Sequence, residues 1–385
     1  MDVKDVARSV VDNSRDDLIA LSHRLHANPE IKWEEVRSSA WVAGALSDGG
    51  FAVETGVCDL PTAFSATAGS GPLHVAICAE YDALPEIGHA CGHNIIAATA
   101  VGAGLALAAV ADEVGLTVHV IGTPAEEGGG GKILMLERGA FDGTHLAMMT
   151  HPAPMDMPAW PMVAAQQFRI RYTGKEAHAA AYPELGINAL DALTVAQVGI
   201  GLLRQHTHHL DKVHGIITHG GDAPNVVPAR TEGEYMVRGR DVAALLVMRD
   251  KVLRCFEAGA LATGCTLDVY PRHEPYAEMH PDPDLVAAYR RNAEVLGRPC
   301  EDPTGTRSGA GSTDMGNVSL AVPSIHPAIG IDSLPAVNHQ PEFTAAAATP
   351  AADQALYDGA VALAWTAIDA ATDDAVRTRL LKRST

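Results

Sequence analysis

The segment LHVAICAEYD, residues 73–82, sets the fold class of this 385-residue chain. It is an apolar run that ends in acidic residues, which is typical of a buried parallel strand that reaches a binding site. The segments LTVHVIGTPAEE (116–127) and HLAMMTHP (145–152) follow the same pattern. Helical patterns separate the three segments. Strands that alternate with helices predict an α/β fold with a mixed, mostly parallel sheet flanked by helices.

Neighbouring segments extend this prediction. Helical spacing of apolar residues predicts helices over 4–28 and 34–47, and alternation predicts short strands near 51–57 and 62–68. The longest apolar run, Ile95 to Ala111, consists mostly of alanine and glycine and is at the short limit for a membrane span. We therefore expect it to form a buried core helix.

The pattern changes after Pro161. The order strand–helix–strand–strand–helix–strand follows, which predicts a ferredoxin-like α+β domain. We place this domain at residues 164–274. We expect it to be inserted into a discontinuous catalytic domain formed by residues 1–163 and 275–385.

The composition excludes some partners. Lys and Arg number 28 against 47 Asp and Glu, so the formal net charge is −19. A surface this acidic repels nucleic acid and anionic membranes, and neither is expected as a partner. The six cysteines form no CxxC pair and the N-terminus lacks an apolar leader. These two features predict reduced thiols in a cytoplasmic protein.

Candidate metal ligands gather where the predicted strands end. In open parallel sheets, ligands bind beyond the carboxyl ends of the strands, so these side chains are expected to meet in one crevice. The candidates are Glu80, Asp82, Cys91, His93, Glu126, Glu127 and His151.

Two motifs carry the metal hypothesis, and each has an ordinary structural alternative. In HACGHN (89–94), Cys91 and His93 are close enough in sequence to bind one metal cluster, or Cys91 is a buried free cysteine beside a helix cap. In GTPAEEGGGG (122–131), adjacent carboxylates are unfavourable unless a cation or a shared proton offsets their repulsion. One carboxylate would bind metal while the other acts as a general base. The alternative is an exposed acidic turn before a helix.

Other candidates are weaker individually. His151 and His339 are single histidines near predicted structural elements, yet Cys, Glu and three His together match a two-metal site for borderline metals. His178 would donate to a developing oxyanion, or is a loop histidine. The remaining candidates for substrate binding are Asn225, the backbone of Gly311 and Ser312, and the arginines Arg238, Arg240 and Arg307, which are otherwise turn and surface residues.

These motifs resemble the two-metal aminoacylase and carboxypeptidase-like metallopeptidases, family M twenty, and within it the amidohydrolase branch. The four glycines after the paired glutamates are most similar to the p-aminobenzoyl-glutamate hydrolase and β-alanyl-dipeptidase members. The motifs that carry the resemblance are RLHANPEI (24–31), AEYDALPEIGHACGHN (79–94), GTPAEEGGGGK (122–132), MMTHPAP (148–154), GKEAHAAAYPELGINALDA (174–192) and GSTDMGNVS (311–319).

The resemblance implies a role for each residue. Two divalent ions would be held by Cys91, which bridges them, and by His93, Glu127, His151 and His339. Glu126 would be the general base and acid, and Asp82 would orient the site. The inserted domain would be a lid and dimerisation domain, whose His178 and Asn225 complete the site across a homodimer interface. Glu80 and Tyr81 stand where many members have Asp-Met, which leaves the role of Glu80 open.

The resulting expectation is a metal-dependent amidohydrolase that cleaves an N-acyl amino acid or dipeptide-like substrate, of the p-aminobenzoyl-glutamate or β-alanyl-dipeptide type. Metal-activated water would attack, with Glu126 as the base. Cysteine and histidine favour zinc, while manganese, cobalt and nickel bind the same residue types. Two alternatives stay open: hydrolysis of a non-peptide amine or carbamoyl substrate, and a catalytically silent homologue that acts as a binding subunit.

Overall fold

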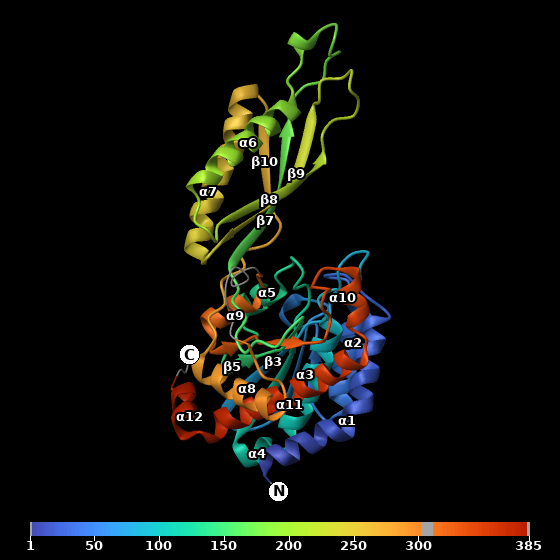
Figure 1. Cartoon of the computed structure of the whole chain (residues 1–385), viewed down its shortest axis with the longest axis vertical. Coiled ribbons are helices and arrows are strands. Elements are labelled where there is room, and N and C mark those ends of the chain that lie inside the picture. The colour runs from blue at the N-terminus through green and yellow to red at the C-terminus, as the bar shows by residue number, and fades with distance from the viewer. Residues whose placement is uncertain (1, 302–310, 383–385) are drawn as a thin grey trace. The chain divides into compact units, whose positions relative to one another are not determined.

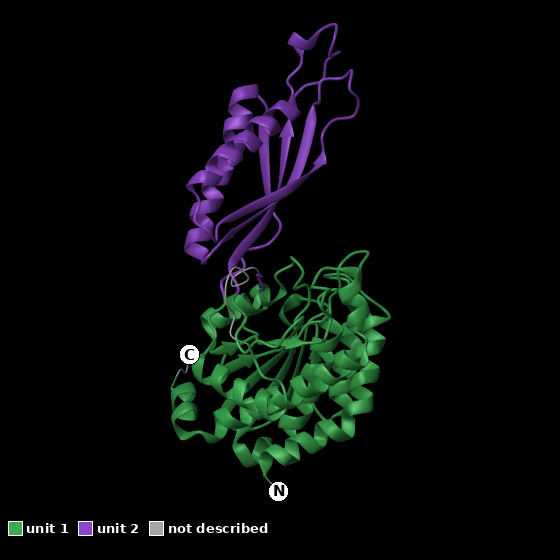
Figure 2. Ribbon diagram, in the orientation of Figure 1, with its two compact units in different colours: residues 1–161, 279–308, 314–385 green, residues 162–278, 309–313 purple. Residues whose placement is uncertain are grey.

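The computed structural model describes residues 2–301 and 311–382. The chain divides into two compact units (Figure 2). Within the described residues, the second unit consists of 162–278 and 311–313, and the first unit contains the rest. The second unit is slightly longer than the sequence predicts because Met162 pairs with Gly311, and Ala165 pairs with Tyr276, in isolated β-bridges.

A mixed, mostly parallel sheet forms the centre of the first unit, which confirms the predicted fold class. In the described chain its strand order is β1-β2-β4-β3-β5-β11. The strands from β4 to β11 pair in parallel, and β2 and β1 add an antiparallel edge. The strands are β1 (Ala52–Thr55), β2 (Phe64–Gly69), β3 (Leu73–Ala79), β4 (Leu116–Gly122), β5 (Leu146–Met148) and β11 (Ser324–Ile325).

Helices cover this sheet (Figure 1). The helices of the first unit are α1 (Val3–His26), α2 (Val36–Asp48), α3 (His93–Ala108), α4 (Ala111–Val114), α5 (Gly131–Glu137), α8 (Pro283–Val295), α9 (Met315–Ala321), α10 (Pro341–Ala346), α11 (Pro350–Thr372) and α12 (Asp374–Leu381), with a 3-10 turn η1 (Val57–Asp59).

Helix α3 is the core of the first unit, as its alanine-rich and glycine-rich sequence predicts. It packs against α1, α11 and the sheet, and it is buried on nearly all sides. Small residues permit this close approach: a Cβ added at Gly102 would lie 2.9 Å from the side chains of both Ala360 and Leu18. Within the described residues, no helix is both long and apolar enough to cross a bilayer.

The predicted strand over 145–152 differs from the structure. Two short strands replace it, β5 in the main sheet and β6 (His151–Ala153), which pairs in parallel with β12 (Ala328–Gly330). The chain changes pairing partner after Met148, and Pro152 has no N–H for a further ladder. His151 therefore begins a separate strand instead of ending a long one.

The second unit has the predicted order of elements. Its strands form an antiparallel sheet in the order β10-β7-β9-β8, which is the ferredoxin-like arrangement. Helices α6 and α7 pack on this sheet around their own apolar core. The elements are β7 (Ala164–Thr173), η2 (Pro183–Leu185), α6 (Ala189–Leu203), η3 (Arg204–His206), β8 (Lys212–His219), β9 (Arg230–Gly239), α7 (Val242–Thr263) and β10 (Thr266–Pro271).

Candidate metal centre

The candidate ligands lie at the ends of the parallel strands of the first unit. Strand β3 ends at Ala79 and is followed by Glu80 and Asp82, while the loop after β4 contains Glu126 and Glu127. Helix α3 begins at His93, and β6 begins at His151. The carboxyl ends of parallel strands meet at one edge of a sheet, so these short loops place their side chains close together.

Three overlapping groups of side chains could each hold a metal ion. Within each group, one potential ligand atom from every residue lies within 4.8 Å of the others. The groups are Cys91, His93 and His151; Cys91, Glu127 and His339; and His93, Glu126 and Glu127. The structure thus brings together all five residues predicted as ligands and also Glu126, the residue predicted as the base.

Asp82 fixes the orientation of His93. One Asp82 oxygen lies 3.1 Å from Nδ1 of His93, and the other accepts a hydrogen bond from the backbone N–H of Glu127 at 2.9 Å. Burial acts to raise the pKa of Asp82, but the hydrogen bond and charge of His93 outweigh it, so the pKa is lowered overall. A carboxylate on Nδ1 leaves Nε2 of the ring available to a metal.

Backbone contacts bring the distant His339 to the centre. Its N–H donates to the carbonyl of Ala90 at 3.0 Å, next to Cys91, and its φ of +70° is in the left-handed region. The side chain of Asn338 donates to the carbonyl of Pro152 at 3.1 Å, and Nδ1 of His151 lies 2.8 Å from the same carbonyl. One loop therefore joins the Cys91 and His151 segments.

The residues present fit a divalent cation. Among the described side chains, Nε2 of His93, Oε1 of Glu127 and Oε2 of Glu80 are buried without a hydrogen-bond partner. Burial, and then the Glu127 carboxylate, raise the pKa of the Cys91 thiol well above its usual range, so a neighbouring cation is needed to hold the thiolate. Thiolate, imidazole and carboxylate donors are the set that zinc prefers.

Glu126 has the environment of a general base. Only 8% of the residue is exposed. Burial, followed by the negative charges of Glu80 and Glu127, raises the pKa of Glu126 well above its usual range. A carboxyl group with a raised pKa can accept a proton and return it near neutral pH.

A buried ion-pair cluster that the sequence patterns did not predict lies beside these residues. Nζ of Lys132 lies 2.6 Å from Glu80 and 2.8 Å from Asp314, and all three side chains are fully buried. The backbone N–H of Lys132 also donates to Asp314 at 2.9 Å. The available signal was Lys132 itself, a lysine in the first turn of α5, which begins at the last of four glycines. This helix start is buried beside the centre.

Two further contacts that the sequence patterns did not predict hold the loop containing Glu126 and Glu127. Lys32 donates to the carbonyl of Glu127 at 2.8 Å. Glu35, whose side chain is buried, accepts a hydrogen bond from the backbone N–H of Ala125 at 2.8 Å. Both residues follow the RLHANPEI motif, and a buried acid at a helix start was the signal that could have identified Glu35.

The remaining predicted residues belong to the second unit. Nδ1 of His178 accepts hydrogen bonds from the backbone N–H groups of Ala180 and Ala181, at 3.3 and 3.2 Å, and the carbonyl of Asn225 accepts from Ala179 at 3.0 Å. The loops of His178 and Asn225 are therefore adjacent.

The predicted arginines and the 311–312 turn differ in their surroundings. Arg240 is exposed and pairs with Asp241 at 2.9 Å. Arg238 donates to Oγ of Ser312 at 2.8 Å, next to Gly311. Arg307 lies outside the described residues.

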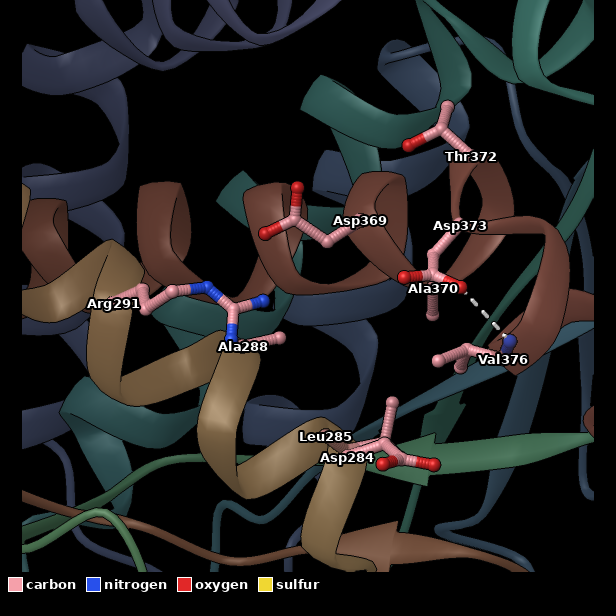
Figure 3. A pocket seen from close by; sticks show the side chains of 9 residues that line it. All are labelled: Asp284, Leu285, Ala288, Arg291, Asp369, Ala370, Thr372, Asp373 and Val376. Atoms are coloured by element: carbon pink, nitrogen blue, oxygen red, sulfur yellow. Dashed lines mark hydrogen bonds between the residues drawn. The ribbon is translucent and has the colours of Figure 1, made fainter.

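A separate pocket of about 210 Å³ lies among α8, α11 and α12 (Figure 3). Two of its acids already have cationic partners, because Asp284 pairs with Arg379 at 2.9 Å and Asp369 pairs with Lys4 at 2.6 Å. No residue that lines this pocket belongs to the three ligand groups, so it is not part of the centre.

Comparison with known proteins agrees with the resemblance found in the motifs. A profile of peptidase family M20/M25/M40 matches residues 76–361. The Xaa-Arg dipeptidase of Mus musculus is 40% identical over 376 residues, which cover 93% of this chain and 86% of that protein. A p-aminobenzoyl-glutamate hydrolase subunit of Escherichia coli is 35% identical over 269 residues, which cover 64% of this chain and 56% of that subunit.

The fold is also shared with solved structures. A dinuclear metal-binding peptidase of the M20 family from Bacillus subtilis superposes with a TM-score of 0.65 at 22% identity. The superposition covers 91% of this chain and 98% of that one. At this level of identity the likeness concerns the fold, and it extends over both compact units.

Proposed function

Because the chain belongs to peptidase family M20/M25/M40, whose members hydrolyse carbon–nitrogen bonds, we propose that it is a metal-dependent dipeptidase. Its preferred substrates are dipeptides with a basic carboxyl-terminal residue. The observation that carries the proposal is the convergence of Cys91, His93, Glu127, His151 and His339 around the buried Glu126.

Two observations favour a basic dipeptide over p-aminobenzoyl-glutamate. The Xaa-Arg dipeptidase matches more of this chain, and more of its own length, than the p-aminobenzoyl-glutamate hydrolase subunit does. The net charge of −19 attracts a cationic dipeptide and repels a substrate with two carboxylates. Hydrolysis of p-aminobenzoyl-glutamate is the second candidate, supported by the 35% identical relative.

The five ligand residues would hold two divalent ions, and the groups overlap because Cys91, His93 and Glu127 each belong to two of them. Bound divalent ions supply Lewis-acid polarisation of the scissile carbonyl and a lowered pKa for water. Zinc is the favoured ion because the donors include a thiolate and imidazoles. Asp82 keeps His93 in the tautomer that a metal requires.

Glu126 performs the proton transfers in this proposal. It removes a proton from the attacking water and returns it to the leaving amine. His178, supplied by the second copy in a homodimer, donates to the oxyanion of the tetrahedral species. Because Nδ1 of His178 accepts two backbone hydrogen bonds, the ring proton of the neutral side chain lies on Nε2, which is free to donate. Asn225, Arg240, Gly311 and Ser312 contribute substrate contacts.

We also propose a homodimer formed through the second unit. Strand β8 is an edge strand of its sheet, and it exposes 65% of Ile216 and 45% of Ile217. An exposed apolar edge strand is a template for pairing with a second copy. The six free cysteines support a reducing, cytoplasmic environment.

Amine release from a panel of substrates tests the function. The panel contains alanyl-arginine, β-alanyl-lysine, p-aminobenzoyl-glutamate, hippurate, an N-acetyl amino acid and a carbamoyl amino acid. Each is assayed with zinc or manganese, with a chelator, and with Glu126→Gln as the blank. Metal-dependent cleavage with the highest kcat/KM on the basic dipeptides supports the proposal. A preference for p-aminobenzoyl-glutamate favours the second candidate, and silence of a metal-loaded protein across the panel favours a binding subunit.

A further inference from the structure

We infer that Glu80 is an additional protein ligand of the metal centre and binds the ion held by His93. This inference rests on the metal centre proposed above. Glu80 does not belong to any of the three ligand groups. The observation that points to it is its short distance to His93.

The two oxygens of Glu80 have different surroundings. Oε1 accepts a hydrogen bond from Nζ of Lys132 at 2.6 Å. Oε2 is buried and has no hydrogen-bond partner among the described residues, and it lies 3.4 Å from Nε2 of His93. A buried carboxylate oxygen without a hydrogen bond costs free energy, so a cation beside this atom would stabilise it.

Asp82, which faces Nδ1 of His93, determines which nitrogen of the ring faces Glu80. Because Nδ1 faces Asp82 at 3.1 Å, the neutral ring carries its proton there, and Nε2 presents a lone pair toward Oε2 of Glu80. Two lone pairs that face each other repel unless a proton or a metal ion lies between them. Zinc binds nitrogen and oxygen at about 2.0–2.2 Å, and two ligands on a tetrahedral ion are then about 3.4 Å apart. The separation of Glu80 and His93 matches that spacing.

Lys132 and Asp314 hold Glu80 in this position. The buried ammonium of Lys132 contacts both carboxylates, and its backbone N–H also donates to Asp314. The Glu80 carboxylate is thereby anchored by one oxygen with the other directed at His93. Outer contacts of this kind orient metal ligands and set their affinity.

The identity of the donor predicts a metal preference. Carboxylate oxygens suit manganese better than soft thiolates do, while zinc is well served by Cys and His. Loss of Glu80 should therefore weaken manganese binding more than zinc binding. A residue that only balances charge within the protein would not discriminate between the two metals.

Metal binding by the full-length chain, measured without substrate, tests the inference. The protein is stripped with a chelator and titrated with Zn²⁺ or Mn²⁺ alone, in competition with a chelating indicator. We expect Glu80→Gln to lower the Mn²⁺ affinity of one of the two metal positions by at least about 10-fold and to leave the other position unchanged. Asp358→Asn is the matched control and should bind both metals normally. It removes a buried carboxylate that does not belong to the ligand groups and that lies 2.7 Å from Arg298.

In Glu80→Gln the buried Lys132 keeps only one carboxylate partner, Asp314, and the variant could fail to fold. A second variant covers that case. Glu80→Asp keeps the negative charge but shortens the side chain, and the visible spectrum of its Co²⁺ form should differ from that of the wild type. A wild-type Co²⁺ spectrum with unchanged affinities overturns the inference and leaves the proposed function standing. If the wild-type chain binds no divalent ion, the proposed function and this inference both fail.

Discussion

The carboxylate of Glu35 accepts a hydrogen bond from the backbone N–H of Ala125 at 2.8 Å, one residue before Glu126. Its other oxygen accepts from the hydroxyl of Thr62 at 3.0 Å. Ala125 has a φ of +58°, a left-handed conformation that costs free energy for a residue with a Cβ. Glu35 therefore holds the strained backbone that presents Glu126 to the centre.

Replacement of Glu35 by alanine should lower kcat by roughly 10- to 100-fold, because small displacements of a catalytic group are costly. KM and metal content should change little, since the Glu35 side chain bonds to the backbone of Ala125 and the hydroxyl of Thr62 and not to a predicted ligand. Steady-state kinetics and metal analysis test this split.

Glu35→Gln is the conservative control. Burial, and then the charge of Asp82, raise the pKa of Glu35 to about 7, so a neutral amide resembles the protonated acid. Its carbonyl can still accept from Ala125, and we expect it to retain most of the activity. Wild-type kcat in the alanine variant would show that Glu35 has no positioning role.

Replacement of Glu126 by glutamine should reduce kcat by about 10²- to 10⁴-fold, the usual contribution of a general acid–base group. The metal content should stay near normal, because the amide fills the same space and the five predicted ligands remain. Turnover and bound metal measured on the same sample provide the test. A wild-type rate in this variant would exclude the proposed mechanism.

Replacement of Asp82 by asparagine should weaken metal binding about 10- to 100-fold, because His93 loses the partner that fixes its tautomer. Asp353→Asn is the control. The Asp353 carboxylate lies 2.7 Å from Nε2 of His23, a histidine that is not among the predicted ligands. Chelator competition should separate the two variants. Equal metal affinity in both would mean that Asp82 does not tune His93.

Much of the site could be predicted because its residues follow simple local patterns. Apolar runs that end in acids locate Asp82 and Glu126 at strand ends, and the two-residue spacing of Cys91 and His93 places both at the start of α3. The strand–helix alternation likewise predicts the mostly parallel sheet. These signals depend on a few neighbouring residues, so tertiary context does not alter them.

The remaining features depend on contacts between distant segments. Lys132 reaches Glu80 and Asp314 across 52 and 182 positions, so the residues around Lys132 do not identify its two partners. His339 reaches the centre through a backbone hydrogen bond to Ala90 and a left-handed conformation. The break after β5 reflects a change of strand partner, which an uninterrupted apolar pattern cannot reveal.

Charge on the β8 edge should prevent the proposed homodimer. Ile216→Lys together with Ile217→Lys places two charges on an edge strand, and such charges block pairing with a second copy. Light scattering after size exclusion should show a dimer for the wild type and a monomer for this variant. Leu261→Lys is the control, because Leu261 is 87% exposed on α7 of the same unit. An unchanged mass for the β8 variant would place the dimer interface elsewhere.

Three histidines interact on the main sheet away from the ligand groups. Nδ1 of His74 lies 3.1 Å from Nε2 of His119, whose other nitrogen is 3.2 Å from Oγ1 of Thr67. Nδ1 of His145 accepts a hydrogen bond from the backbone N–H of His74 at 3.0 Å. Only one of the two rings can supply the proton of the His74–His119 contact, so protonation of both rings breaks it.

This contact predicts a loss of stability in acid. Burial, and then the charge of His74, lower the pKa of His119 to about 4, against about 6.5 in the unfolded chain. Folding thus favours the neutral ring, so its contribution is complete above pH 6.5 and is lost as the pH falls toward 4. His119→Gln should flatten the decline in unfolding free energy over this range by up to about 3 kcal/mol. Urea unfolding of chelator-treated protein measures the difference, with His208→Gln, at an exposed position, as the control. Parallel pH curves for His119→Gln and the wild type would contradict the prediction, because an uncharged side chain cannot reproduce a histidine's titration.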